Sequence, residues 1–387
     1  MAKFLIIHPI NLDVYGGGER VCQYVIKALL AHGQQVELLT FDFDRSRYKE
    51  VMGDEFPNIK VHTLGKRLEV KPPFTIYKRR QNVVKLLKQF KQTVNSKYDY
   101  NFLTQWFSGF EGTYLSKTEK NIAYVHFPEI HYLYDHSGFR RKAYLWLYRW
   151  WLNKGIGKLN LIFCNSQYTK GIIERYWNKY GIPEPIVVYP PVDIESFRSD
   201  KPLRERAKRV VYVGRFVGAK RHDLLKKLAI DLPQFEFVSV GGLKDSEENW
   251  FEDFSKNLPS NYVLKPNLPR AELIKLLQES GVYFHAMEGE HFGIAPVEAL
   301  ASGCVTIVHN SGGSSEFIPI EFRWDNYDDL KQKIVKWLDP PDQSDAWEKT
   351  REELWAKISV LEPKNFEENL WSQVHAFMQK TESSNIK

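Results

Sequence analysis

Residues 4–40 read FLIIHPINLDVYGGGERVCQYVIKALLAHGQQVELLT. The stretch begins with an apolar run at residues 4–7 and closes with a second apolar run at residues 36–40. Between them, a glycine turn leads into residues 20–31, where apolar side chains recur at helical spacing. A strand, a helix and a strand in this order predict a βαβ unit, which implies a parallel sheet.

The same alternation continues along the chain and starts again in the second half. Further strands are expected at residues 59–64, 122–126, 161–164, 209–213, 236–240, 282–286 and 305–309. Helices are expected at residues 222–230, 271–278, 296–301 and 366–380. This pattern predicts an α/β protein with two Rossmann-like domains.

The boundary between the two domains is marked by proline. Residues 187–193 read VVYPPVD, and Pro190 and Pro191 interrupt any continuous element. We therefore expect a first domain at residues 1–188 and a second at residues 189–365.

The composition of the 387 residues is that of a globular protein, with 43% hydrophobic and 26% charged side chains. Cys22, Cys164 and Cys304 lie far apart and form no zinc-binding pattern, which favours a reducing compartment without disulfides or a structural metal. The most apolar segment, residues 143–152, is broken by Arg149 and is too short to span a membrane. The first residues, MAKFLIIHP, are expected to form a strand and not a signal peptide.

Positive charge is concentrated in the first half of the chain. Residues 1–200 carry 29 basic and 19 acidic side chains, whereas residues 201–387 carry 25 and 29. Residues 66–97 hold ten Lys or Arg and one acid, Glu69, and residues 139–152, FRRKAYLWLYRWWL, mix cations with aromatic rings. Such a composition is typical of a surface that docks to an anionic membrane. An ordinary packed helix and a solvated charged face explain the same two segments equally well.

The sharpest motif is EHFGIAPVE, in which Glu290 and Glu298 are separated by seven residues. A strand is expected just before it, and Pro296 fits the first turn of a helix, so the motif falls at the carboxyl edge of a parallel sheet, where α/β proteins bind ligands. The amides of Gly293 and Ile294 would face an anion. Glu298 could accept hydrogen bonds from a ribose diol, and Glu290 could face a sugar ring. Taken alone, the two glutamates also fit a capped helix with solvated side chains.

A second motif, residues 211–223, reads VYVGRFVGAKRHD. A strand leads into a turn at Gly214, and two cations, Arg215 and Lys220, precede a helix. Arg215 can bind a diphosphate bidentately and Lys220 can add a point charge, so the pair would neutralise a leaving diphosphate without a metal ion. Basic residues after a strand are usually surface charges. Together with the glutamate motif, however, they account for both ends of a nucleoside diphosphate sugar.

A glycine turn, YGGGER at residues 15–20, lies between the first strand and the first helix. Gly16, Gly17 and Gly18 allow the backbone to approach a ligand closely, and the helix N-terminus favours phosphate. The turn fits neither a P-loop nor the G-x-G-x-x-G fingerprint. His126 follows another expected strand; it is either a hydrogen-bonded structural residue or a contact to a sugar.

Five motifs occur in the order seen in the retaining glycosyltransferases of family 4, which have the GT-B fold, and the chain resembles that family over residues 4–378. The motifs are GGGERV from Gly16, CNSQYT from Cys164, YPPVD from Tyr189, VGRF from Val213 with Lys220, and Glu290 with Glu298. Within the family, EHFGI from Glu290, HNSGG from His309 and VHFP from Val125 look most like the mannosyltransferases that extend lipid-linked oligosaccharides in asparagine-linked glycosylation.

The resemblance implies a GDP- or UDP-sugar donor in a central cleft that the parallel sheets of the two domains face. Matched by position, Arg215 and Lys220 would hold the diphosphate, Glu298 the ribose, Glu290 the donor sugar and His126 the hydroxyl groups of that sugar. Further donor contacts are expected from Gly16, Gly17, Gly18, Gly214, Phe292, Gly293 and Ile294.

Other features of the family are expected to follow. No Asp-x-Asp motif occurs in the expected place, which agrees with a metal-independent mechanism that needs no cofactor. Residues 366–387 would form the last helix, which crosses back to the first domain. Gly18 stands where the family commonly has alanine, a small change expected to leave the turn intact.

These expectations describe a retaining hexosyltransferase that moves mannose from GDP-mannose onto a lipid-linked or other glycan acceptor, in the cytoplasm and peripheral on the cytoplasmic membrane face. A UDP-sugar donor stays open, because base contacts near residues 264–268 can come from the backbone. A non-catalytic nucleotide-sugar-binding subunit is disfavoured because all the matched site residues are present. A nucleic-acid-binding protein is a further alternative, but the chain has no recognisable motif of that kind, and nucleic acid is not expected as a partner.

Overall fold

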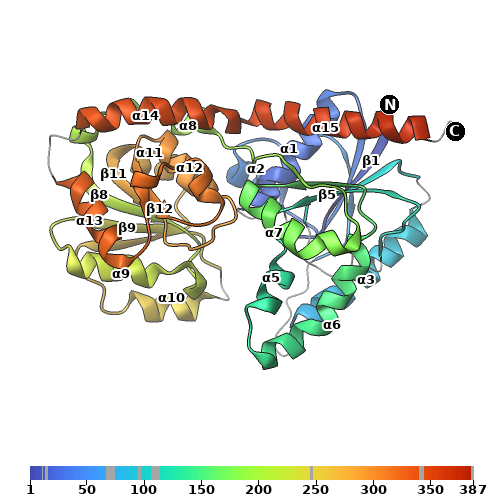
Figure 1. Ribbon diagram of the computed structural model, residues 1–387, viewed down its shortest axis with the longest axis horizontal. Helices are drawn as coiled ribbons and strands as arrows, with labels where there is room; N and C mark the ends of the chain where they lie inside the picture. The colour runs from blue at the N-terminus through green and yellow to red at the C-terminus, as the bar shows by residue number, and fades with distance from the viewer. Residues whose placement is uncertain are drawn as a thin grey trace. The chain divides into compact units, whose positions relative to one another are not determined.

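The computed structural model describes residues 1–10, 12–13, 16–66, 75–94, 97–105, 114–244, 247–339 and 344–384. The chain forms two compact units, Met1–Pro191 with Pro363–Lys387 and Val192–Glu362 (Figure 1). These divisions lie within three residues of the expected boundaries after residues 188 and 365.

The first unit is built on a seven-stranded parallel sheet with the strand order β3-β2-β1-β4-β5-β6-β7. This is the order of a doubly wound Rossmann sheet, as predicted. The strands are β1 (Lys3–His8), β2 (Gln35–Thr40), β3 (Lys60–Thr63), β4 (Tyr100–Leu103), β5 (Lys120–Val125), β6 (Leu161–Cys164) and β7 (Ile186–Val187). The helices are α1 (Gly17–Ala31), α2 (Arg45–Met52), α3 (Thr75–Thr93), α5 (Glu129–Asp135), α6 (Phe139–Ile156), α7 (Gln167–Trp177) and α15 (Pro363–Ser384).

Both faces of this sheet are covered, because side chains along a strand alternate between the two faces. In β1, Phe4 and Ile6 join one buried cluster, to which α1 and α15 contribute. Leu5 and Ile7 join the other, to which α3, α6 and α7 contribute. The continuous apolar runs of the sequence are therefore strands buried on both sides.

Helix α15 belongs to the first unit although it ends the chain. Phe366, Leu370, Val374 and Met378 recur every four residues and are buried in the cluster with α1. The ring of Trp371 stacks on His32 of the first unit with centroids 4.5 Å apart. The helix is longer than the one expected at residues 366–380, and residues 385–387 lie outside the described part of the chain.

The second unit has a six-stranded parallel sheet with the order β10-β9-β8-β11-β12-β13. Its strands are β8 (Ala207–Val213), β9 (Glu236–Gly241), β10 (Tyr262–Pro266), β11 (Ser280–Phe284), β12 (Val305–His309) and β13 (Arg323–Trp324). Its helices are α8 (Ile194–Phe197), α9 (His222–Asp231), α10 (Glu248–Ser255), α11 (Arg270–Glu279), α12 (Ile294–Ala301), α13 (Tyr327–Leu338) and α14 (Ser344–Ile358). The prediction of two Rossmann-like parallel sheets is confirmed.

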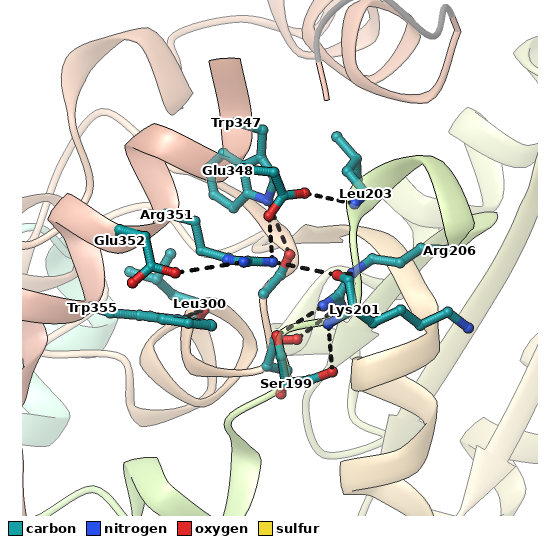
Figure 2. A network of polar contacts seen from close by, with 12 residues as sticks. Ser199, Lys201, Leu203, Arg206, Leu300, Trp347, Glu348, Arg351, Glu352 and Trp355 are labelled. Atoms are coloured by element: carbon teal, nitrogen blue, oxygen red, sulfur yellow. Dashed lines mark hydrogen bonds and ion pairs between the residues drawn. The ribbon is translucent and has the colours of Figure 1, made fainter. Parts of the chain in front are cut away.

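Figure 2 shows a buried polar network at the amino ends of the strands of this second sheet. Arg206 is 6% exposed and donates to the backbone carbonyls of Lys201 at 2.9 Å and Ser302 at 2.8 Å. Gly303 has a φ of 82°, which favours glycine, and a Cβ atom there would lie 2.4 Å from the Arg206 guanidinium and displace it. One cation thus satisfies carbonyl groups from separate segments of the unit.

Helix α14 is fastened to the same region. Arg351 pairs with Glu348 at 2.6 Å and donates to the Lys201 carbonyl at 3.3 Å. The indole of Trp347 donates to the Gly303 carbonyl at 3.1 Å, and the indole of Trp355 to the Leu300 carbonyl at 2.9 Å. These bonds hold α14 against the end of α12 (Figure 2).

Replacement of Arg206 should destabilise the second unit. In Arg206→Ala, buried carbonyl groups lose their donor, which is expected to lower the free energy of unfolding by about 2–4 kcal/mol. Urea denaturation followed by circular dichroism measures the change. Lys208→Ala, which removes only an exposed ion pair with Asp339, is the control and should cost no more than about 0.5 kcal/mol. Equal losses in the two variants would contradict a role for the buried network.

Candidate functional site

The loop that carries Glu290 lies between β11 and α12, at the carboxyl edge of the second sheet. Its backbone touches the loop after β12: the Gly313 amide donates to the Glu290 carbonyl at 2.6 Å. A Cβ atom on Gly312 would lie 2.4 Å from that same carbonyl, and one on Gly313 would lie 2.2 Å from the His291 carbonyl. Only glycine allows two backbones to approach so closely, so the HNSGG sequence fixes the position of the glutamate.

The Glu290 carboxylate is held by three groups. Oε2 lies 3.1 Å from His285 Nε2 and 3.5 Å from Lys220 Nζ, and Oε1 accepts from the His291 amide at 3.1 Å. Burial acts to raise the pKa of Glu290, but the hydrogen bond from His285 and the charge of Lys220 outweigh it and hold the pKa well below its ordinary value. The side chain is therefore an ionised carboxylate in a fixed orientation.

His285 was not singled out in the sequence, yet it orients this carboxylate. It is 4% exposed, and its Nδ1 lies 3.1 Å from the Tyr283 hydroxyl. Burial raises the pKa of Tyr283, so the hydroxyl keeps its proton and can donate it to Nδ1. When Nδ1 accepts this hydrogen bond, the hydrogen of the ring lies on Nε2, which is the atom that faces Glu290. The Trp324 indole donates to the His285 carbonyl at 3.2 Å and holds the backbone in place.

The basic motif reaches the same carboxylate from the loop after β8. The turn Gly218–Lys220 places the Lys220 ammonium beside Glu290, although the two residues are 70 positions apart. The Tyr212 hydroxyl donates to the Lys220 carbonyl at 2.6 Å, which fixes the turn. Arg215 begins this loop and is exposed; in the part of the chain that the structure describes, its guanidinium has no acid or carbonyl partner. One pair of predicted site residues is therefore in contact, and a second cation of the same loop is available to a ligand.

Glu298 has a more buried environment than the sequence suggested. It is 3% exposed on α12, and Arg270 Nη1 lies 3.5 Å from its carboxylate. The same guanidinium pairs with Asp193 at 2.9 Å. Arg270 was missed in the sequence, because it lies 28 residues from its partner in a stretch with no recognisable motif. The solvated glutamate that the helix-cap interpretation requires is not what the structure shows.

The remaining residues of the glutamate motif are placed by their backbone. Gly293 has a φ of 92° and is the N-cap of α12, so its amide and that of Ile294 lie at the helix start. Phe292 is 3% exposed and its ring packs edge-on against Phe317. Its side chain is thus part of the core, which leaves its main chain as the part available to a ligand.

Candidate residues of the first unit form a separate group. His126 follows β5, and its Nε2 lies 3.1 Å from the Thr104 carbonyl. Gly16 is the N-cap of α1, whereas Gly17 and Gly18 already belong to its first turn and not to a preceding loop. A Cβ atom on Gly18 would lie 2.0 Å from Gln105 Nε2 and 3.5 Å from His126 Nε2, so an alanine there would displace the end of the Gln105 side chain. Tyr15 lies outside the described residues.

Comparison with known proteins identifies the class. Residues 15–196 match the family model described as Glycosyltransferase Family 4, and residues 193–353 match the one described as Glycosyl transferases group 1. The two matches together span residues 15–353 and identify glycosyltransferase domains in the chain, and the resemblance found in its motifs is confirmed.

Two curated relatives are similar to part of the chain. The GDP-Man:Man(3)GlcNAc(2)-PP-Dol alpha-1,2-mannosyltransferases of Xenopus tropicalis and Homo sapiens are each 32% identical to the chain, over 171 and 173 residues. The matches cover 40% of this chain and 34% and 35% of the two relatives, so the chain spans about a third of their length.

Solved structures share the fold over nearly the whole chain. Sucrose-phosphate synthase from Thermosynechococcus elongatus has a TM-score of 0.73 at 17% identity, covering 97% of this chain and 100% of that one. The catalytic domain of starch synthase IV from Arabidopsis thaliana has a TM-score of 0.67 at 12% identity, covering 99% of each chain. The GT-B fold is therefore confirmed.

Replacement of His285 should impair the Glu290 site without unfolding the chain. A hydrogen bond to a charged group contributes about 1.5–3 kcal/mol, so His285→Ala is expected to lower kcat for glycosyl transfer about 10- to 100-fold. His285→Gln should recover most of the activity, because its amide can donate to Glu290 from the place of Nε2. Steady-state kinetics on nucleotide sugars, with thermal melting as a control for folding, make the comparison. Equal activity of the Ala and Gln variants would show that His285 acts through packing alone.

Proposed function

We propose that the protein is a retaining hexosyltransferase that takes mannose from GDP-mannose and transfers it to a lipid-linked or other glycan acceptor. The observation that carries the proposal is the contact between the Lys220 ammonium and the ionised Glu290 at 3.5 Å, with the exposed Arg215 on the same loop. The relatives are named as mannosyltransferases that use GDP-Man, which supports the choice of donor.

The positive charges of Arg215 and Lys220 suit the departure of a nucleoside diphosphate. Bond cleavage leaves negative charge on the diphosphate and positive character on the anomeric carbon. Arg215 and Lys220 then stabilise the transition state more than the ground state, because the negative charge develops as the bond breaks. Lys220 would exchange its carboxylate partner, Glu290, for the diphosphate, and Glu290 would stay in place through His285 and its hydrogen bond from the His291 amide.

The other donor groups follow from the same arrangement. We assign the ribose to Glu298, which Arg270 orients. The amides of Gly293 and Ile294, at the start of α12, would face the donor as helix N-termini face anions. His126 is assigned to the hydroxyl groups of the transferred sugar. Attack from the face of the leaving group, with the leaving phosphate as base, would give retention, and no metal ion or cofactor is invoked.

A UDP-sugar is the alternative donor, and one experiment separates the candidates while it tests the site. GDP-mannose at 100 times its dissociation constant should stabilise the fold by about 2.7 kcal/mol, whereas UDP-sugars at the same concentration should shift the melting temperature less.

Lys220→Ala and Arg215→Ala are each expected to lower mannosyl transfer about 10²- to 10³-fold with unchanged melting of the free protein. Arg221→Ala, which removes only a pair with Glu288, is the matched control and should keep near-normal activity. If none of the nucleotide sugars stabilises the protein, the proposal is overturned.

A peripheral position on the cytoplasmic face of a membrane is part of the proposed function. On α6, Phe139, Trp146 and Trp150 are 86%, 60% and 43% exposed, and their spacing places them on one side of the helix. The same helix has five basic residues and no acid. Exposed tryptophan among cations is typical of a surface that lies at lipid head groups. Among the described residues, no helix has both the length and the apolar character needed to cross a bilayer.

Removal of the two tryptophans should release the protein from membranes. Burial of one such side chain is worth about 1.5–3 kcal/mol, so the double variant Trp146→Ser/Trp150→Ser is expected to bind vesicles at least about tenfold more weakly. Flotation with phosphatidylcholine vesicles, with and without phosphatidylglycerol, measures the bound fraction. Ile320→Ser removes a side chain that is 61% exposed on the second unit and should leave binding unchanged. Absence of binding by the unmodified protein at low salt would end the membrane assignment.

A further inference from the structure

The first unit contains a cavity of about 370 Å³ that none of the donor contacts uses. It lies between α3, α5 and α6, and it reaches Pro9 and Phe41, which directly follow β1 and β2. The cavity therefore borders the carboxyl edge of the first sheet, where α/β proteins bind ligands. Its volume is within the range of small-molecule sites.

The walls of the cavity are mainly apolar and aromatic. They include Phe41, Ile76, Ile130, Leu133, Leu145 and Tyr148. Leu145 and Tyr148 are 4% and 3% exposed, so they form the buried side of α6, opposite its exposed tryptophans. One helix thus lines the cavity with one face and presents tryptophan to the surroundings with another.

The remaining wall residues give the cavity a positive charge. Among the described residues, Arg79, Arg80 and Arg141 line it together with one acid, Glu129. Arg80 is buried with its guanidinium 3.7 Å from the centre of the Trp151 ring, whereas Arg79 and Arg141 form no ion pair within the described ranges. An apolar chamber whose wall includes the guanidinium groups of Arg79 and Arg141 suits a ligand that is apolar at one end and anionic at the other.

The two basic helices contact each other, and neither of them contributes an acid to the cavity. Helix α3 has six basic residues and α6 has five, and neither has an acidic one. Tyr77 of α3 joins them: its hydroxyl donates to the Tyr144 carbonyl, and its ring packs edge-on against Trp151 with centroids 5.9 Å apart. Like charges held side by side repel each other, and a bound anion would offset that repulsion.

We propose that this cavity binds the phosphate and the adjoining part of the apolar chain of an amphiphilic acceptor, a phosphate ester of a long hydrocarbon chain. The proposal rests on the proposed function, because it assigns the acceptor of that reaction to a site. Arg79 and Arg141 bind the phosphate, and the side chains of α5 and α6 surround the first part of the chain. The rest of the chain continues past α6 into the lipid layer that Trp146 and Trp150 contact. A free sugar would leave the apolar walls without a partner, and a bare phosphate would fill only the basic end.

Calorimetric titration with farnesyl phosphate tests the cavity on the full chain. Binding is expected to weaken at least about tenfold in Arg79→Ala and in Arg141→Ala, and to be lost in Leu133→Trp, which fills the chamber. Lys78→Ala and Arg140→Ala remove the same charge from neighbouring positions on the same helices, and both should bind within about twofold of the unmodified protein. Farnesol and inorganic diphosphate should each bind more weakly than farnesyl phosphate. Farnesol has the hydrocarbon chain without the phosphate, and inorganic diphosphate has the anionic group without the chain.

The outcomes separate this proposal from the donor assignment. Thermal stabilisation by GDP-mannose should be the same in all five variants, since all five substitutions lie in the first unit and none is at a residue assigned to the donor. Farnesyl phosphate binding that Leu133→Trp leaves unchanged, or that falls equally in Arg141→Ala and Arg140→Ala, would overturn the cavity site even if GDP-mannose binds. Equal binding of farnesyl phosphate and inorganic diphosphate would mean a phosphate site only and would also overturn it. If the unmodified protein does not bind GDP-mannose, the proposed function is refuted, whereas the result for binding of farnesyl phosphate to the cavity is unaffected.

Discussion

The close approach of two backbones, at Glu290 and at Gly312 and Gly313, is the constraint on which the candidate site depends. Any side chain at either glycine would push the loops apart, because a Cβ atom would lie within 2.4 Å of a carbonyl oxygen. With the backbone fixed, the glutamate side chain has one region to occupy, between His285 and Lys220. The functional geometry therefore begins with main-chain packing, and the charged groups are added to it.

The ion pairs of the second unit show how its cations can serve an anionic ligand although the second half of the chain has more acids than bases. Its key carboxylates are already committed: Glu290 to His285 and Lys220, and Glu298 to Arg270. Arg270 also binds Asp193, the last residue of the YPPVD linker motif. A paired carboxylate repels an approaching diphosphate less than a free one does. We therefore propose that a diphosphate first meets the charge of Arg215, which no acid in the described chain neutralises.

Much of the fold could be predicted because the central strands are continuous apolar runs. The strands expected at residues 161–164 and 305–309 match β6 and β12 to the residue. Four strands were missed: β7 and β13, which have only two residues each, and the longer β4 and β10. Strand β4 is short and contains Asn101, whose amide bonds to Asn121 at 3.0 Å inside the sheet, a pairing that no local pattern reveals. Strand β10 lies at an edge, where Pro266 is tolerated and Val263 is 40% exposed, so its apolar pattern is weak.

Some residues of the candidate site could likewise be predicted from the sequence, and others could not. Glu290, Glu298 and the two cations of the basic loop belong to motifs with fixed spacing, and such spacing can be read without a structure. His285, Arg270 and Gln105 act through contacts with residues far away or across a strand end, and their own neighbours in the sequence give no signal.

Of the basic segment at residues 66–97, residues 67–74 and 95–96 lie outside the described chain; most of the others form α3. The excess of charge there has a structural consequence that composition alone could not show, because α3 faces a second acid-free helix across an apolar cavity. A solvated charged face needs no such partner, so the cavity favours a ligand as the reason for the charge.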